Sequence, residues 1–349
     1  LPMAKSSPQQ VKGSFTDIQT AGALAAFKMK DSPVSGKVSG TVELSFLGSD
    51  LRTIDGKISA RFDGKSDQST DAIPLTGEVE ITASGGLFTF DKAQLSTTAT
   101  KLTATGKLNY QGESDLRVSL TTSQAEELIQ IARSIEQARP FIVENEPQLI
   151  GELKFDGRVT GKPDSAVVEG DVSAATVGLR DALIGALSGH VLVSAKELKI
   201  EKGVLTALNG GSAKFDLFAP LDPKAETGRL EATINRISLE TILAATGLPD
   251  AGDFISGDIS GKTSLTGLPG ALRGEAKISL VEGRIAEQPA SLATADLKFD
   301  GQQALLELLE VQLPKSHLTA TGSFHLKDFV FQAQGKADQI ALDSIAESF

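Results

Sequence analysis

Residues able to do acid–base or metal chemistry are few in this chain and stand far apart. There are three histidines, His190, His317 and His325. On an extended strand the last two would lie about 26 Å from each other and could not share a metal ion. We therefore expect each histidine to be a solvated surface residue rather than a metal ligand or a catalytic base.

The acidic residues form no catalytic or metal-binding arrangement either. Glu126 and Glu127 are adjacent on a predicted helix and face different directions, so we expect a cap and dipole pair rather than a general acid and base. Asp250 and Asp253 are too sparse for a calcium loop and are expected to be solvated. No nucleophile elbow, zinc-protease motif, phosphate-binding loop or dinucleotide fingerprint occurs. The sequence predicts no enzyme, no catalytic residue, no metal and no cofactor.

The composition narrows the function classes further. The chain has 34 basic and 45 acidic residues, a net charge of −11, which disfavours binding to nucleic acid. It has no Cys, which excludes disulfides and thiolate chemistry. With no Trp and one Tyr, a carbohydrate-active enzyme would have few aromatic side chains for sugar stacking.

The elements that hold these residues are mainly strands, because polar and apolar residues alternate with period two. Such runs are 38–46, 116–120, 213–217, 230–234 and 295–299. Between them stand dipeptides typical of tight hairpin turns, Asp55-Gly56, Asp63-Gly64, Asp156-Gly157, Asn209-Gly210 and Asp300-Gly301. We therefore expect neighbouring strands to pair antiparallel.

One clear helix interrupts the strands. Ser123 is the predicted N-cap, with Glu126 three residues later and Pro140 beyond the end. Its apolar stripe, expected to cover the sheet, is Ala125, Leu128, Ile129, Ala132 and Ile135. Shorter helical turns are predicted after Ser238 and after Leu342.

Internal repeats predict the architecture independently of local propensity. Leu-Thr-Ala-Thr-Gly at 102–106 recurs at 318–322, an offset of about 216 residues, and other pairs recur at about half that distance. The repeat unit is then about 105 residues long, whereas the length alone would favour about two domains. We predict three units, 1–140 ending in the amphipathic helix, 141–248 and 249–349; the alternative is chance similarity between Gly-, Ser- and Thr-rich strands.

An alternating sheet must cover its apolar face with a second sheet, by closing into a barrel, or by curling into a groove. The inward candidates are mostly Leu, Ile, Val and Ala with scattered Phe. An aliphatic lining suits a curved sheet that holds acyl chains at least as well as a dry sandwich. The predicted fold is an elongated, twisted, antiparallel repeating β-groove with a few short helices between its units.

Four segments in this order resemble the AsmA and TamB family of bacterial envelope proteins: Ser-Gly-x-Ile-Ser-Gly at 256–261, Leu-Thr-Gly-Leu-Pro-Gly-Ala-Leu-Arg-Gly at 265–274, Ile-Ser-Leu-Val-Glu-Gly-Arg-Ile at 278–285 and Leu-Thr-Ala-Thr-Gly at 318–322. The resemblance is closest over about residues 150–349, and the first repeat unit supports it more loosely. It implies a lipid-lined β-groove in the periplasm, tethered to the inner membrane, that carries phospholipid to the outer membrane or assists its assembly. This sequence shows neither the N-terminal membrane helix of that family's full pattern nor a decisive C-terminal domain, so the AsmA-like and TamB-like branches both stay open.

No stretch of about 20 apolar residues long enough for a membrane helix occurs. The sequence begins Leu1-Pro2-Met3, so position 1 is not an initiator Met, and the start lacks the charged-then-apolar order of a signal peptide. We therefore expect a piece of a longer or processed protein, with any anchor outside this sequence.

The expected partners are phospholipid acyl chains, together with envelope proteins of the inner and outer membranes. The residues predicted to line the groove are Leu44, Phe46, Phe88, Phe90, Phe215, Leu217, Leu297 and Phe299. The alternative is a structural or adhesive β-sandwich repeat of the cell surface, in which the same side chains form a closed core.

Overall fold

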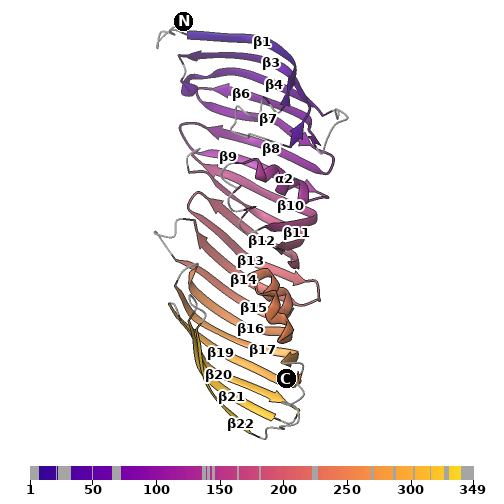
Figure 1. Cartoon of the computed structure of the whole chain (residues 1–349). Coiled ribbons are helices and arrows are strands. Elements are labelled where there is room, and N and C mark those ends of the chain that lie inside the picture. Colours follow the sequence, from indigo (N-terminus) through magenta and orange to yellow (C-terminus); the bar gives the residue numbers. More distant parts are fainter. Residues whose placement is uncertain are drawn as a thin grey trace. The chain divides into compact units, whose positions relative to one another are not determined.

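The computed structural model describes residues 8–20, 22, 33–48, 50–64, 72–135, 139, 142–143, 146–162, 165–180, 182–221, 227–268, 271–285, 288–301, 303–314, 316–325 and 330–338. In this part of the chain the protein is mainly β. Twenty strands belong to one open antiparallel sheet, and two short α-helices interrupt them (Figure 1). The predicted mainly β, antiparallel fold with few short helices is confirmed.

The chain divides into two compact units, which are described separately. Unit 1 comprises residues 1–175 and 192–195, and unit 2 comprises residues 176–191 and 196–349. The finer division into three repeat units stays a prediction.

In unit 1, consecutive strands of the main sheet pair in chain order. They are β1 (Pro8–Gln19), β3 (Lys37–Leu47), β4 (Asp55–Asp63), β6 (Thr76–Ser84), β7 (Leu87–Ser96), β8 (Thr100–Asn109), β9 (Ser114–Thr122) and β10 (Pro147–Gly161). A separate parallel pair is formed by β2 (Val34–Ser35) and β5 (Ile73–Pro74). A 3-10 helix, η1 (Leu51–Thr53), precedes β4. The next strand, β11 (Val167–Leu179), contains the boundary between the units.

Unit 2 continues the same pattern from most of β12 (Ala182–Ser194) onward. Its further strands are β13 (Glu197–Ala207), β14 (Ser212–Pro220), β15 (Gly228–Ser238), β16 (Ile255–Leu268), β17 (Leu272–Ile285), β18 (Gln288–Ala290), β19 (Leu292–Gly301), β20 (Gln303–Leu313), β21 (Ser316–His325) and β22 (Phe331–Asp338). Antiparallel registers link β13 through β17, β17 to both β18 and β19, and β19 through β22.

Strand alternation separates the residues of unit 2 into two faces, because direct cross-strand partners project to the same side. On one side Ile259 is opposite Leu280, and Leu280 is opposite Ala293. Ala293 is in turn opposite Val311. These side chains are buried and form the centre of a hydrophobic core cluster. We call this side the apolar face of unit 2, and the other side its polar face.

Bulges keep the apolar face continuous where the sequence period changes. Ile234 pairs with Gly261, but the next apolar partner on β15 is Ile237, opposite Ile259. Arg236 fills the extra position with φ of 53°, in the left-handed region, and its backbone N–H donates to Ser260 Oγ at 2.9 Å. A bulge of this kind inserts a residue without turning the following side chains to the wrong face.

The predicted turn dipeptides divide into confirmed and incorrect cases. Asn209-Gly210 forms the turn between β13 and β14, and Gly301 ends β19 with φ of 74°. Asp55-Gly56 and Asp156-Gly157 are wrong as turns, because the first pair begins strand β4 and the second lies inside the 15-residue strand β10. A Cβ on Gly157 would come within 2.3 Å of the Glu169 carbonyl oxygen, so glycine here permits close strand approach rather than chain reversal.

Helix α2 (Glu126–Arg133) confirms the predicted helix but not its cap. Ser123 is not the N-cap: its backbone N–H donates to the Ala99 carbonyl at 3.1 Å, and the helix begins two residues later than predicted, after Ala125. Ala125 is only 1% exposed, and its N–H donates to the Gly151 carbonyl at 2.8 Å. Continued pairing with neighbouring backbone therefore takes precedence over the local capping signal.

Helix α4 (Leu239–Thr246) confirms the helical turn predicted after Ser238. Ser238 Oγ accepts from the Thr241 N–H at 3.1 Å, and Gly247 ends the helix with φ of 85°. A 3-10 helix, η2 (Pro249–Asp253), follows. The turn predicted after Leu342 lies outside the described residues.

Candidate functional site

The candidate site is the apolar face of unit 2, where cross-strand rows of aliphatic and small residues succeed one another. One row runs Ile259, Leu280, Ala293, Val311, Leu318 and Ala337. The adjacent row runs Gly261, Ile278, Ala295, Leu309, Ala320 and Gly335. No charged side chain interrupts either row, so this surface can interact with a ligand through apolar contact alone.

Residues of these two rows line an open apolar hollow of about 600 Å³. Its large lining side chains include Ile259, Ile278, Leu280, Leu309, Val311 and Leu318. Leu239 at the start of α4 and Phe254 just before β16 also line it. A volume of this size is within the usual range for sites that hold a small ligand.

Small residues create the depth of the hollow. In the second row, Ala295, Ala320 and Gly335 line the hollow, and Ala295 and Ala320 alternate with the larger Ile278 and Leu309. The small positions leave space above the backbone between the neighbouring large side chains. The helix then supplies a wall, because Leu239 and Ile242 pack against the buried cluster beneath.

The four residues predicted for the groove in unit 2 lie on this face but beside the hollow. Phe215 and Leu297 belong to one row, connected through Ala232, Thr263 and Ala276. Leu217 and Phe299 belong to the next row, connected through Leu230, Leu265 and Gly274. All four are half-buried, and none of them lines this hollow, whereas Phe215 also borders the charged hollow described below.

In unit 1 the predicted residues also share one face of the sheet. Leu44 and Phe88 belong to a single row, with Gly56 and Ala83 between them. Phe90 is opposite Ile81 in the adjacent row, and Phe46 lies at the end of β3, opposite Gln9. All four predicted side chains are half-buried. The structure therefore brings Leu44, Phe88 and Phe90 onto neighbouring rows, and leaves Phe46 at the rim.

Sequence reasoning missed the residues of the hollow although it recognised their strands. Ile278 and Leu280 lie in a segment that the family resemblance singled out, and alternation marks both as apolar. What the pattern did not show is that α4 returns over these rows, and that small residues of β19 and β21 face them. Alternating apolar residues next to a predicted helix were the available signal.

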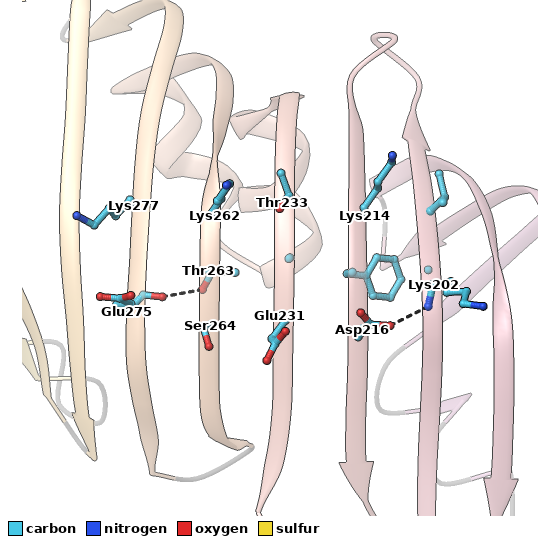
Figure 2. A pocket seen from close by; sticks show the side chains of 14 residues that line it. Lys202, Lys214, Asp216, Glu231, Thr233, Lys262, Thr263, Ser264, Glu275 and Lys277 are labelled. Atoms are coloured by element: carbon cyan, nitrogen blue, oxygen red, sulfur yellow. Dashed lines mark hydrogen bonds between the residues drawn. The ribbon is translucent and has the colours of Figure 1, made fainter.

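The polar face of unit 2 carries its own hollow, of about 830 Å³, lined by charged side chains in two levels (Figure 2). Lys214, Lys262 and Lys277 occupy one level, whereas Asp216, Glu231 and Glu275 occupy the other (Figure 2). Asp216 accepts the backbone N–H of Lys202 at 2.8 Å, and Lys277 forms an ion pair with Asp296 at 3.5 Å.

Two pairs of direct cross-strand partners in this hollow carry like charge, Asp216 with Glu231 and Lys262 with Lys277. Such pairs repel one another and favour hydration. All four side chains are exposed. This surface is therefore a hydrated, charged face, in contrast to the apolar one.

The histidines and acidic residues considered as possible metal ligands lie at separate positions in the fold. His317 Nε2 lies 3.1 Å from Glu310 Oε1 on the adjacent strand, whereas His325 ends β21. Asp250 and Asp253 are exposed in η2. Among the described residues, no cluster of His, Asp and Glu has the arrangement of a metal site.

Glu127 differs from the expected surface dipole pair. Its side chain is buried, 8% exposed, and its Oε2 accepts from Thr100 Oγ1 at 2.9 Å. Thr100 Oγ1 also lies 3.0 Å from Thr122 Oγ1. Glu127 therefore fastens α2 to β8 and β9, whereas Glu126 stays exposed.

None of the helices in the described part of the chain has the length and hydropathy needed to cross a bilayer. No family model, curated protein or solved structure matches the chain. Inference about function therefore starts from the two faces of the sheet.

Proposed function

We propose that the apolar face of this sheet binds the acyl chains of phospholipids and shields them from water during transfer between the inner and outer membranes of a bacterial envelope. This is the role implied by the resemblance to the AsmA and TamB family. It is a binding function without catalysis, performed in the periplasm, and its partners are lipids together with envelope proteins at either membrane.

The observation that carries the proposal is an apolar face with no second layer over most of it. Within the described part of unit 2, every strand belongs to the same sheet, and contacts between strands run mainly between neighbours. The buried hydrophobic residues are mostly small, chiefly Ala, while large side chains such as Leu297 and Phe299 stay half-buried. A β-sandwich would bury such side chains against a facing sheet.

The energetics suit carriage of lipid. Each buried methylene contributes about 0.8 kcal/mol, so two acyl chains laid along apolar rows would be held firmly. Because the rows repeat small and aliphatic side chains, an acyl chain meets similar contacts at successive positions, and its movement along the face meets only low barriers. Polar headgroups would stay in water at the rim.

Native mass spectrometry and lipid extraction of the gently purified chain test the proposal. The expected result is phospholipid in stoichiometric amount. Absence of lipid across several mild preparations would contradict it and would favour the structural or adhesive repeat.

A further inference from the structure

The apolar hollow in unit 2 is bordered by one strongly exposed aromatic side chain, Phe254, and a second exposed apolar residue, Leu248, precedes it on the segment that follows α4. Phe254 lines the hollow, yet 63% of it is exposed. Leu248 lies between α4 and η2 and is 51% exposed. An aromatic side chain that lines the hollow but has most of its surface in water lies at the mouth of the hollow rather than on its floor.

The mouth is built on a fixed frame. The backbone N–H of Leu248 donates to the Leu243 carbonyl at 2.8 Å, which reverses the chain after α4. Glu240 Oε1 accepts from the Gly257 N–H at 3.2 Å, and Arg180 Nη1 donates to the Ala245 carbonyl at 2.6 Å. Both ends of α4 are therefore tied to neighbouring segments, and the exposed Leu248 and Phe254 stand on either side of η2 in the sequence.

The charge at the mouth indicates which surface it can approach. Asp250 and Asp253, between the two apolar residues in the sequence, are both exposed, while the Arg180 guanidinium lies beside Gly247 and Lys336 borders the hollow. The charges at the mouth are therefore mixed, whereas the chain as a whole has a net charge of −11. Anionic lipid surfaces repel a chain of this net charge, whereas zwitterionic surfaces do not.

We infer that Leu248 and Phe254 form an entry point that contacts a zwitterionic lipid surface and passes an acyl chain into the hollow. This inference rests on the proposed function and adds to it a place of entry and a class of donor surface. Partial insertion of the two side chains lowers the barrier to lipid leaving the bilayer, because the acyl chain then moves from the apolar bilayer interior onto apolar side chains without crossing water.

The first test uses the absence of tryptophan from the chain. Phe254→Trp gives a single fluorophore at the mouth, and Thr233→Trp gives a control on the exposed polar face. Both are mixed with phosphatidylcholine vesicles that carry brominated acyl chains. We expect quenching of the Trp at 254 and little at 233; equal quenching, or none at 254, overturns the inference.

The second test measures the rate of lipid uptake. Leu248 does not line the hollow, so Leu248→Ser should slow uptake from phosphatidylcholine vesicles about fivefold and leave the final lipid content unchanged. Leu221→Ser is the matched control, since Leu221 is similarly exposed, at 55%, and follows the last residue of β14 instead of helix α4. An unchanged rate in Leu248→Ser, with lipid still bound, overturns the inference alone; absence of lipid from the unaltered protein overturns the proposed function and the inference with it.

The third test addresses charge. Vesicles rich in phosphatidylglycerol should donate lipid more slowly than phosphatidylcholine vesicles, and Asp250→Asn with Asp253→Asn should narrow that difference. Equal rates from both vesicles in the unaltered protein would contradict a zwitterionic donor surface.

Discussion

The ring of Phe215 lies over Gly203, its direct partner on the neighbouring strand. A Cβ added to Gly203 would fall 2.7 Å from Cζ of the ring and 2.8 Å from both Cε atoms. The aromatic side chain thus covers a strand position that has no side chain of its own, a way of restoring packing beside a glycine.

Gly203→Ala should lower the free energy of unfolding of unit 2 by roughly 1–3 kcal/mol, because the added methyl group displaces the ring. Urea unfolding measures the effect. Gly252→Ala serves as a control, since its Cβ would meet only the Glu240 side chain, at ordinary distances of 3.6 Å from Cγ and 3.8 Å from Cβ. In a Phe215→Ala background the cost of Gly203→Ala should disappear; a cost that persists would mean that the ring is not its cause.

Glu127→Ala should destabilise unit 1 by about 1–3 kcal/mol, because it leaves the buried Thr100 hydroxyl without its carboxylate acceptor. Glu126→Ala is the natural control: the residue is adjacent, in the same first helical turn, and exposed. Both variants lose a charge near the helix N-terminus, so their difference isolates the buried hydrogen bond. Equal unfolding midpoints would show that Glu127 does not fasten the helix.

Asp115 should titrate below its ordinary range. The Arg158 guanidinium holds the pKa of this carboxyl down because it donates two hydrogen bonds, from Nε at 3.0 Å and Nη2 at 2.6 Å. A carboxyl with a lowered folded-state pKa stabilises the fold above its unfolded pKa of about 3.9, and this contribution is lost as pH falls through the folded value. Arg158→Gln should return the pKa to the ordinary range in an NMR titration of the carboxyl carbon. The same pKa in both proteins would mean that the ion pair does not persist in solution.

Sequence alternation predicted the strand faces well, because a period of two is a direct consequence of strand geometry. Phe215, Leu297 and Phe299 all lie on the apolar side, as their spacing indicated. The bulge at Arg236 could not be predicted in this way. It changes the spacing of apolar residues from two to three between Ile234 and Ile237, and the partner Ser260 that stabilises it comes from another strand.

The position of the hollow could not be predicted from the sequence, for a related reason. It depends on which small residues face which large ones across strands, as Ala295 faces Ile278 and Leu309. That register is a tertiary property. Likewise, Asp156-Gly157 has the composition of a turn, but its place in a long paired strand is decided by its neighbours.

The proposed lipid carriage makes a paired prediction on β19, where adjacent residues face opposite sides. Leu297→Asp places a carboxylate on the apolar face, in the row of Phe215, whereas Lys298→Asp places it on the polar face, opposite Glu275 and Leu305. Leu297 is only half-buried, so the variant should still fold, which circular dichroism can check.

Burying a carboxylate against acyl chains is costly, so Leu297→Asp should reduce transfer of fluorescent phospholipid between vesicles by at least about tenfold. Lys298→Asp changes the charge by more, yet should leave transfer near the level of the unaltered protein. This contrast separates a requirement for an apolar surface from a general effect of charge. A folded Leu297→Asp protein that transfers lipid at the normal rate would show that this row of the apolar face does not carry acyl chains.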